Sequence, residues 1–297
     1  MKRRILLVSD MHFTTNFSEA ELKKTHPEAI ASAASGNAFG LTQEQKMEKM
    51  LSDILREHEK VPLDQIFVLG DLSIDDADFR KLPENYCLKF RDEYMARFPA
   101  PVYVIPGNHD SYSNEKWQNI FGTPRQFTLE LEGLTAIFLD TFAQTPAQSA
   151  SGSPYTGIDE DYLEQALKNA KDGPFILCAH MFREGCVSPR AQSLLQDKRI
   201  ICLFRGHTHH NETLSCAGKP MIDIGGYAYE GMKTETGYTF NIFSPRWAWG
   251  YEMMEYEDGH FTVSHMQTDM HYIAENGVFD LPFEAVENRK FIYQEGK

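Results

Sequence analysis

Five short apolar segments lie in the first two thirds of the sequence, and each is followed closely by an aspartate, asparagine or histidine. They read ILLVSDMH at 5–12, IFVLGD at 66–71, VYVIPGNHD at 102–110, FILCAH at 175–180 and IICLFRGHTH at 200–209. Short continuous apolar runs predict strands with both faces buried, as in sheets that helices cover. Ligand sites of open α/β sheets form beyond the carboxyl ends of the strands. We therefore expect the five polar ends to meet at one site.

Helical patterns lie between these predicted strands. Thr42 and Gln45 fit a capping box. The helix after them keeps one face, formed by Met47, Met50, Leu51, Ile54, Leu55 and His58. A second helix is predicted at 84–98, before two prolines. Asp159 fits the N-cap of a third helix, which we expect to end near Gly173. Strands that alternate with helices in this way indicate an α/β fold.

The last third of the chain changes character, because short strands follow one another with glycine-containing turns between them. These strands are predicted at 214–216, 221–224, 238–243, 251–256 and 261–265. An earlier strand pair is predicted at 127–131 and 134–139, turning near Gly133. Nothing in the sequence reads as a linker before the last strands. We therefore expect a single domain over residues 1–297, in which residues 211–297 complete a second sheet.

Two long polar connections, 13–41 and 143–157, interrupt this plan. The first leaves the predicted sheet at the edge where the site is expected, and so long a connection is uncommon inside a compact domain. A loop that covers a substrate and a loop that lies in solvent both fit this pattern. The composition of the two segments names no substrate.

Composition and charge exclude several classes of protein. The chain has 297 residues, 42% of them hydrophobic, and a formal charge of −14 at pH 7. An acidic chain of this kind disfavours nucleic-acid binding, which needs a basic stripe, and binding to anionic membranes. No run approaches the roughly 18 apolar residues of a membrane helix, and the opening MKRRILLVSD has too few apolar residues for a signal peptide. We therefore expect a cytoplasmic protein without a nucleic-acid or membrane partner.

The polar strand ends form a set of oxygen and imidazole donors without a thiolate. The set consists of Asp10, His12, Asp71, Asn108, His180, His207 and His209, with His109 and Asp110 beside it. Such donors suit Mn²⁺, Fe²⁺ or Fe³⁺, Zn²⁺ and Mg²⁺. Seven ligands are too many for one zinc ion, whereas two ions about 3.5 to 4 Å apart would use them together with water. Two cations repel and need a shared anionic ligand, for which Asp71 is the candidate.

Taken in chain order, these blocks resemble the calcineurin-like metallophosphoesterase superfamily. The matching motifs are Asp10-Met-His12, Gly70-Asp71, Gly107-Asn108-His109-Asp110, His180 and Gly206-His207-Thr208-His209. The resemblance implies a four-layer αββα sandwich of two mixed sheets, which is the metallo-dependent phosphatase-like fold. It also implies a dinuclear centre that holds Mn, Fe or Zn, and hydrolysis of a phosphoric ester bond in a small phosphorylated substrate.

The resemblance further implies a role for each residue. One ion would bind Asp10, His12, Asp71 and His209. The other would bind Asp71, Asn108, His180 and His207. A hydroxide that bridges two cations is a usable nucleophile near neutral pH, but the ions supply no proton for a departing alkoxide. His109 would supply that proton as the catalytic acid, with Asp110 beside it.

Other classes of protein require sequence features that this chain lacks or matches less closely. The segment after Asp71 lacks the Asp-Arg-Gly ending of protein serine/threonine phosphatases and is more similar to the GDL-x-x-D of bacterial cyclic-nucleotide and related phosphodiesterases. A non-catalytic scaffold with this fold is expected to lose ligands or the acid, and all are present here. A metallo-β-lactamase-like site would need Asp and His at the positions of Asn211 and Glu212. We expect a dinuclear phosphoesterase, with a cyclic-nucleotide or nucleotide phosphodiesterase and a scaffold as alternatives.

Several polar residues near these motifs have simpler explanations. Asp140 ends an apolar strand but matches no ligand, so we expect it to support the structure or the ligands from behind. Gly225-Gly226 is expected to form a tight turn near the site, because no helix follows that would bind a phosphate. Four histidines outside the motifs are expected to lie in solvent, namely His26, His260, His265 and His271.

Overall fold

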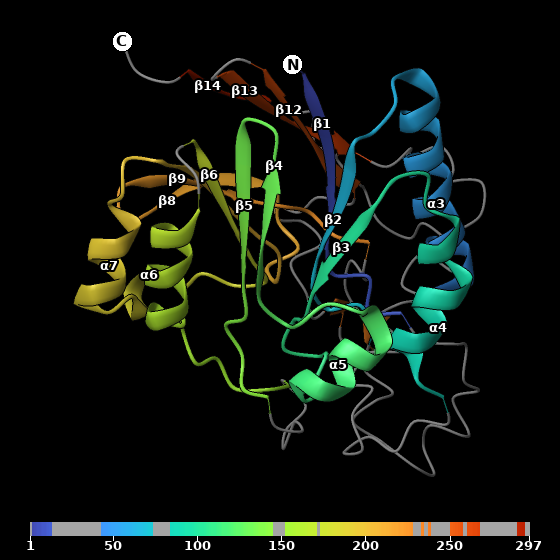
Figure 1. Ribbon diagram of the computed structural model, residues 1–297. Helices are drawn as coiled ribbons and strands as arrows, with labels where there is room; N and C mark the ends of the chain where they lie inside the picture. The colour runs from blue at the N-terminus through green and yellow to red at the C-terminus, as the bar shows by residue number, and fades with distance from the viewer. Residues whose placement is uncertain are drawn as a thin grey trace.

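Two six-stranded mixed sheets face each other at the centre of the protein, as its computed structural model shows (Figure 1). The structure describes residues 2–13, 43–73, 84–144, 152–170, 173–227, 233–234, 237–238, 250–257, 260–267 and 290–294. In spatial order, the first sheet consists of β14 (Lys290–Gln294), β13 (His260–Gln267), β12 (Gly250–Glu257), β1 (Arg3–Val8), β2 (Gln65–Leu69) and β3 (Val102–Ile105). The second consists of β4 (Phe127–Leu131), β5 (Leu134–Leu139), β6 (Phe175–Ala179), β7 (Ile200–Arg205), β9 (Lys219–Asp223) and β8 (Glu212–Cys216). A small ribbon pairs β10 (Lys233–Thr234) with β11 (Gly237–Tyr238).

Helices cover the outer face of each sheet. On the first sheet these are α3 (Gln43–Lys60), α4 (Tyr86–Glu93) and, near the end of β3, α5 (Asn114–Phe121) (Figure 1). On the second they are α6 (Glu160–Asn169) and α7 (Pro189–Leu195). Two short 3₁₀ helices, η1 (Met95–Arg97) and η2 (Glu184–Cys186), lie in the connections. Side-chain caps start four of the α-helices, at Asn85, Ser113, Asp159 and Ser188.

Three apolar cores separate these four layers. Leu6 and Val8 of β1 pack toward Ile54 of α3, in the core between the first sheet and its helices. The alternate residues Ile5 and Leu7 pack into the core between the two sheets. A third core lies between the second sheet and the helices α6 and α7. Because both faces of each central strand are covered, the strands are apolar throughout, as the sequence pattern predicted.

Within each sheet, the strands that carry the predicted ligands run parallel to one another. β1 pairs with β2, and β2 with β3, in parallel register within the first sheet. β6 and β7 are parallel neighbours within the second. Parallel strands end at the same edge of a sheet, so both sheets send their polar loops toward a common place. The fold thus gathers five distant parts of the chain.

The observed fold confirms the predicted αββα sandwich of two mixed sheets and corrects some details. Residues 211–297 do not complete a single second sheet, because β8 and β9 extend the second sheet and β12 to β14 extend the first. The helix expected at 84–98 ends at Glu93 and continues only as η1. Residues 14–41 of the first long loop, residues 145–151 of the second, and residues 239–243 of the strand expected at 238–243 lie outside the described residues. That the whole chain forms one domain stays a prediction.

The inner face of α3 is more polar than its sequence pattern indicated. Leu55, expected on the apolar face, is 36% exposed. Buried charged side chains lie there instead, and they pair: Lys49 Nζ lies 2.7 Å from Asp53 Oδ1, and Arg4 Nη2 of β1 lies 2.9 Å from Glu57 Oε2. A periodicity analysis counts apolar residues only, so it cannot see an inner helix face built from ion pairs.

Candidate metal centre

The predicted ligands stand on sharp turns at the strand ends. Five of the seven have a positive φ: Asp10 (54°), His12 (45°), Asp71 (50°), His207 (74°) and His209 (58°). Residues other than glycine avoid this left-handed region, at a cost of order 1–3 kcal/mol each when the surrounding structure imposes it. Strain of this kind concentrated at one place supports a functional site.

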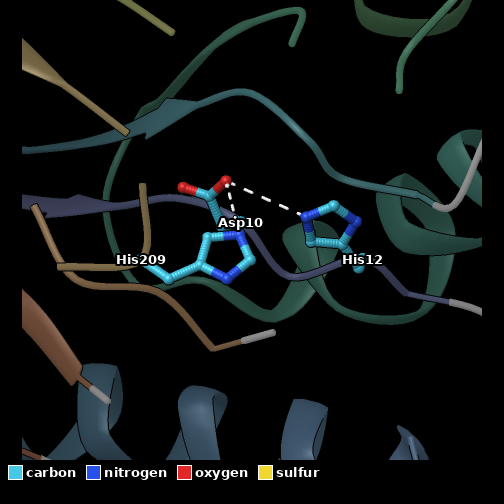
Figure 2. A group of neighbouring side chains, drawn as sticks. All are labelled: Asp10, His12 and His209. Atoms are coloured by element: carbon cyan, nitrogen blue, oxygen red, sulfur yellow. Dashed lines mark ion pairs between the residues drawn. The ribbon is translucent and has the colours of Figure 1, made fainter. Parts of the chain in front are cut away.

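The first group of ligands joins the end of β1 to the loop after β7. Asp10, His12 and His209 each offer one ligand atom, and these atoms lie within 4.8 Å of one another. Asp10 Oδ1 is 3.3 Å from His209 Nε2 and 3.9 Å from His12 Nε2, and both rings point toward it (Figure 2). Asp10 Oδ2 accepts a hydrogen bond from the backbone N–H of His207, at 2.9 Å, which fixes the carboxylate.

The second group joins the ends of β2, β3, β6 and β7. Asp71, His180 and His207 again bring one ligand atom each within 4.8 Å. Asp71 Oδ2 lies 3.1 Å from His180 Nε2 and also 3.5 Å from His12 Nε2, so this oxygen faces both groups. Asn108 Oδ1 lies 3.2 Å from His180 Nε2 and 2.9 Å from His207 Nδ1. All seven predicted ligands therefore lie together at one site.

These donor atoms fit metal ions. Nitrogen and oxygen ligands bind Zn²⁺ at about 2.0–2.2 Å, so atoms that share an ion lie about 3.0–3.5 Å apart. Asp10 Oδ1 is buried and accepts no hydrogen bond from any described residue, although imidazole nitrogens surround it. His180 Nδ1 lies 2.7 Å from the backbone carbonyl oxygen of Leu69, which leaves Nε2 as the ligand atom. The buried oxygen and these imidazole nitrogens are donor atoms of the kind that bind a metal cation.

The electrostatics of the pocket favour the same conclusion. Burial raises the pKa of the Asp10 carboxyl, but His180 and His209 more than offset it, and the net pKa is about 2. Burial also raises the pKa of Asp71, but nearby histidines, chiefly His180, lower it well below its usual value. Burial lowers the pKa of His180, but Asp71 and Asp10 raise it to about 9. Two buried carboxylates thus attract a positive charge, which bound cations would supply in place of the His180 proton.

His109 and Asp110 differ in where they lie. The His109 ring is half-buried and packs edge-on against His12, with 4.9 Å between ring centroids, while its backbone N–H donates to Asp71 Oδ1 at 2.9 Å. Asp110 is fully buried, and its carboxylate accepts the backbone N–H groups of Gly107, Leu72 and, at 3.2 Å, Ser73. Burial raises the pKa of Asp110 to about 6. Its contacts hold the loops in place, and they do not reach the pocket.

Glycines let the loops approach one another. A Cβ built on Gly226 would lie 2.8 Å from the Cβ of Asp10, so this glycine packs on a predicted ligand, as expected for a turn near the site. Gly70 precedes Asp71 with φ +91°, and a Cβ there would lie 2.6 Å from Gly107 N and 2.7 Å from His180 Nδ1. Two ligand loops are therefore in contact where only a glycine fits.

We expect Gly70→Ala to destabilise the protein by about 1–3 kcal/mol more than Gly122→Ala. Both glycines have a positive φ, but a Cβ on Gly122 would meet nothing within 4 Å. The control therefore carries only the backbone strain, about 1–2 kcal/mol, whereas Gly70→Ala also displaces His180. Chemical denaturation of the metal-free variants measures both losses. Equal losses would show that the contact with Gly107 and His180 relaxes without cost.

Several supporting residues were not identified from the sequence. Thr208 Oγ1 donates to Asp223 Oδ2 at 2.7 Å, which anchors the loop between His207 and His209 to the end of β9. Asn211 Nδ2 donates to Glu252 Oε1 at 2.6 Å. His265, expected in solvent, is instead buried, with Nδ1 2.7 Å from Glu252 Oε1. A pattern analysis cannot pair Glu252 with His265, because they meet only through the register of β12 and β13.

Phe142, directly before the 143–157 loop, and Ser153 within it both contact residues of the second ligand group. The backbone N–H of Ser153 donates to the carbonyl oxygen of Asn108 at 2.7 Å. Phe142 is buried, and its ring centroid lies 5.7 Å from that of His180 and 6.2 Å from that of His207. The second ligand group therefore has an aromatic wall behind it. The sequence indicated this aromatic wall only through the position of a polar loop directly after a predicted strand.

Comparisons with known proteins agree with the geometry. A family model described as calcineurin-like phosphoesterase matches residues 3–211. A probable cyclic nucleotide phosphodiesterase of Pseudoalteromonas sp. (strain SM9913) is 24% identical over 208 residues, covering 67% of this chain and 75% of that protein. A dimetal phosphatase from Danio rerio superposes with a TM-score of 0.60 at 11% identity, covering 90% of this chain and 96% of that one. A purple acid phosphatase from yellow lupin seeds gives 0.55 at 13% identity, covering 98% and 53%. At these identities the two structures establish the fold alone.

Proposed function

Because the chain belongs to the calcineurin-like phosphoesterase family and is a hydrolase of phosphoric ester bonds, we propose that it cleaves a small phosphomonoester or phosphodiester at a centre of two metal ions. The observation that carries the proposal is the convergence of five strand ends, whose ligand atoms form two groups with Asp71 between them. None of the helices in the described part of the chain has the length and apolar character of a membrane span.

In this proposal the chain holds each ion with four side chains. Asp10, His12, Asp71 and His209 form the first set. Asp71, Asn108, His180 and His207 form the second. Two bound ions of Mn, Fe or Zn would supply a nucleophile from water near neutral pH and would neutralise charge on the phosphoryl oxygens. Asp71 belongs to both sets because its Oδ2 lies 3.1 Å from His180 Nε2 and 3.5 Å from His12 Nε2.

His109 is proposed as the acid that protonates the leaving oxygen. Its ring packs against His12 beside the ligand groups and is only half-buried, which leaves part of it accessible to a substrate. Its backbone N–H is bound to Asp71 Oδ1, which couples the position of the ring to the ligand loops. Asp110 supports this role as a positioning residue, because its buried carboxylate ties the His109 loop to the residues after β2.

Cyclic nucleotides are the first diesters to consider. The Pseudoalteromonas relative bears that activity in its name, and the segment after Asp71 resembles the same class of phosphodiesterase. The proposal therefore names a small phosphoester, with a 3′,5′-cyclic nucleotide as the specific candidate.

We expect activity to depend on added metal. Chelation followed by desalting should abolish hydrolysis of p-nitrophenyl phosphate, its bis ester and 3′,5′-cyclic AMP, and Mn²⁺ should restore it for at least one of them. Metal analysis should give two equivalents per chain, because the donors form two sets. A protein that binds two equivalents and turns over none of the three esters would favour the alternative of a non-catalytic scaffold. Turnover that survives complete chelation would contradict the metal centre.

A further inference from the structure

A buried arginine connects the loop of His109 to the second sheet. Arg125 lies between α5 and β4 and is 1% exposed. Its Nε donates to Asp140 Oδ2 at 2.6 Å and its Nη2 to Asp140 Oδ1 at 3.2 Å. Its Nη1 donates to two backbone carbonyl oxygens, of Asp110 at 3.2 Å and of Tyr112 at 2.6 Å. The sequence showed Asp140 at the end of a strand but gave it no partner.

The loop that carries His109 is therefore held from two sides. On the side of the first sheet, the carboxylate of Asp110 accepts the backbone N–H groups of Leu72 and Ser73. On the side of the second sheet, the carbonyl oxygen of the same residue accepts a hydrogen bond from Arg125. His109 directly precedes this doubly anchored residue. Both anchors therefore constrain the backbone next to His109.

The same ion pair also reaches the second ligand group. Asp140 Oδ1 accepts the backbone N–H of Phe142 at 3.2 Å. The Phe142 ring packs against His180 and His207. Asp140 thus fixes the start of the loop that forms the aromatic wall, while Arg125 fixes the loop of the acid.

We propose that Arg125 and Asp140 are positioning residues, which hold His109 at the leaving-group side of the pocket by clamping the segment 110–112 to the end of β5. The proposal rests on the role of His109 in the proposed function. A guanidinium is suited to this task because its planar fork binds a carboxylate with two N–H groups and still has donors for two carbonyls. A lysine in its place keeps the charge but cannot make these contacts together.

Arg125→Lys is the informative variant, because removing either charge outright would leave a buried ion without a partner. We expect the variant to keep both metal equivalents and its KM. Its kcat for an alkyl phosphoester, which needs a proton for its leaving group, should fall about 10- to 100-fold, since small misplacements are costly. Its kcat for the corresponding p-nitrophenyl ester should fall less than about threefold, since that anion leaves without a proton.

A double-mutant cycle then separates positioning from general support of the fold. If Arg125 acts through His109, Arg125→Lys should change turnover less than about twofold in the His109→Ala background. Equal losses for both leaving groups, or the same loss in both backgrounds, would overturn the proposal. Arg4→Lys is the matched control, because buried Arg4 also contacts two carbonyl oxygens, of Glu57 and Val61, and the Glu57 carboxylate. It should lower stability and leave the ratio of the two kcat values unchanged.

A measurement that needs no turnover tests the positioning role of Arg125 even if the proposed function is wrong. Wild-type protein that binds two metal equivalents but hydrolyses no ester would refute the proposed function. The contact of Arg125 with the segment 110–112 would then still be tested by this second measurement. With ¹³C-labelled histidine rings, the His109 signal is the one missing from His109→Ala. In Arg125→Lys this signal should shift or broaden, whereas the signal of His58 on α3, whose Nδ1 accepts the backbone N–H of Leu63, should stay unchanged. An unchanged His109 signal would overturn the proposal.

Discussion

Asp71→Asn should leave the protein with at most one firmly bound metal equivalent and lower turnover by at least about 10³-fold. Oδ2 of this buried carboxylate faces His12 on one side and His180 on the other. An amide keeps the shape but brings no negative charge to hold two cations near each other. Removing one preorganised electrostatic donor from an active site already costs about 10²–10³-fold, and losing an ion removes more than one donor.

Metal analysis and thermal unfolding test this result independently of turnover. Ligands that bind only the folded state raise its stability, by about 2.7 kcal/mol at a concentration one hundred times Kd. Added Mn²⁺ should therefore raise the Tm of the wild-type protein clearly and that of Asp71→Asn little. Glu57→Gln is the control, since it removes a carboxylate that is equally buried but lies on α3, paired with Arg4. Two retained equivalents in Asp71→Asn would remove Asp71 from its shared position.

Strand positions and candidate ligands could be predicted because both depend on local sequence. Apolar runs that end in polar residues identified β1, β2, β3, β6 and β7, and the structure brings all seven predicted ligands to one pocket. Parallel pairing explains why: once neighbouring strands run in the same direction, their ends must meet. The αββα architecture came from the resemblance carried by the five motifs, and the observed sheets confirm it.

Residues whose role depends on register or on long-range pairing could not be predicted. Arg125 meets Asp140 only because β4 and β5 pair as an antiparallel hairpin, and a single arginine at 125 belongs to no recognisable sequence pattern. The sharing of residues 211–297 between both sheets likewise follows from β12 pairing with β1, more than two hundred residues away in sequence. The sequence of a single strand, such as β12, does not indicate which of the two sheets that strand will join.

His109→Ala should separate metal binding from proton donation. We expect two metal equivalents and the full Mn²⁺-dependent rise in Tm, because the predicted ligands remain. Turnover of an alkyl phosphoester should fall by about 10²–10⁴-fold, which is the usual contribution of a general acid, and turnover of a p-nitrophenyl ester much less. His210→Ala serves as the control, since this neighbouring histidine contributes to neither metal set in the proposal.

The geometry also allows an outcome that would reassign His109. A ligand atom of its ring lies within 4.8 Å of those of His12 and Asp71, so these three residues could themselves hold an ion. If His109→Ala loses one metal equivalent and turnover of both esters falls together, His109 is a ligand and the proton must come from elsewhere. If metal content and turnover of the alkyl ester both stay at the wild-type level, His109 has neither role. Only retained metal with a loss confined to poor leaving groups supports the acid, because no ligand variant would spare the p-nitrophenyl ester.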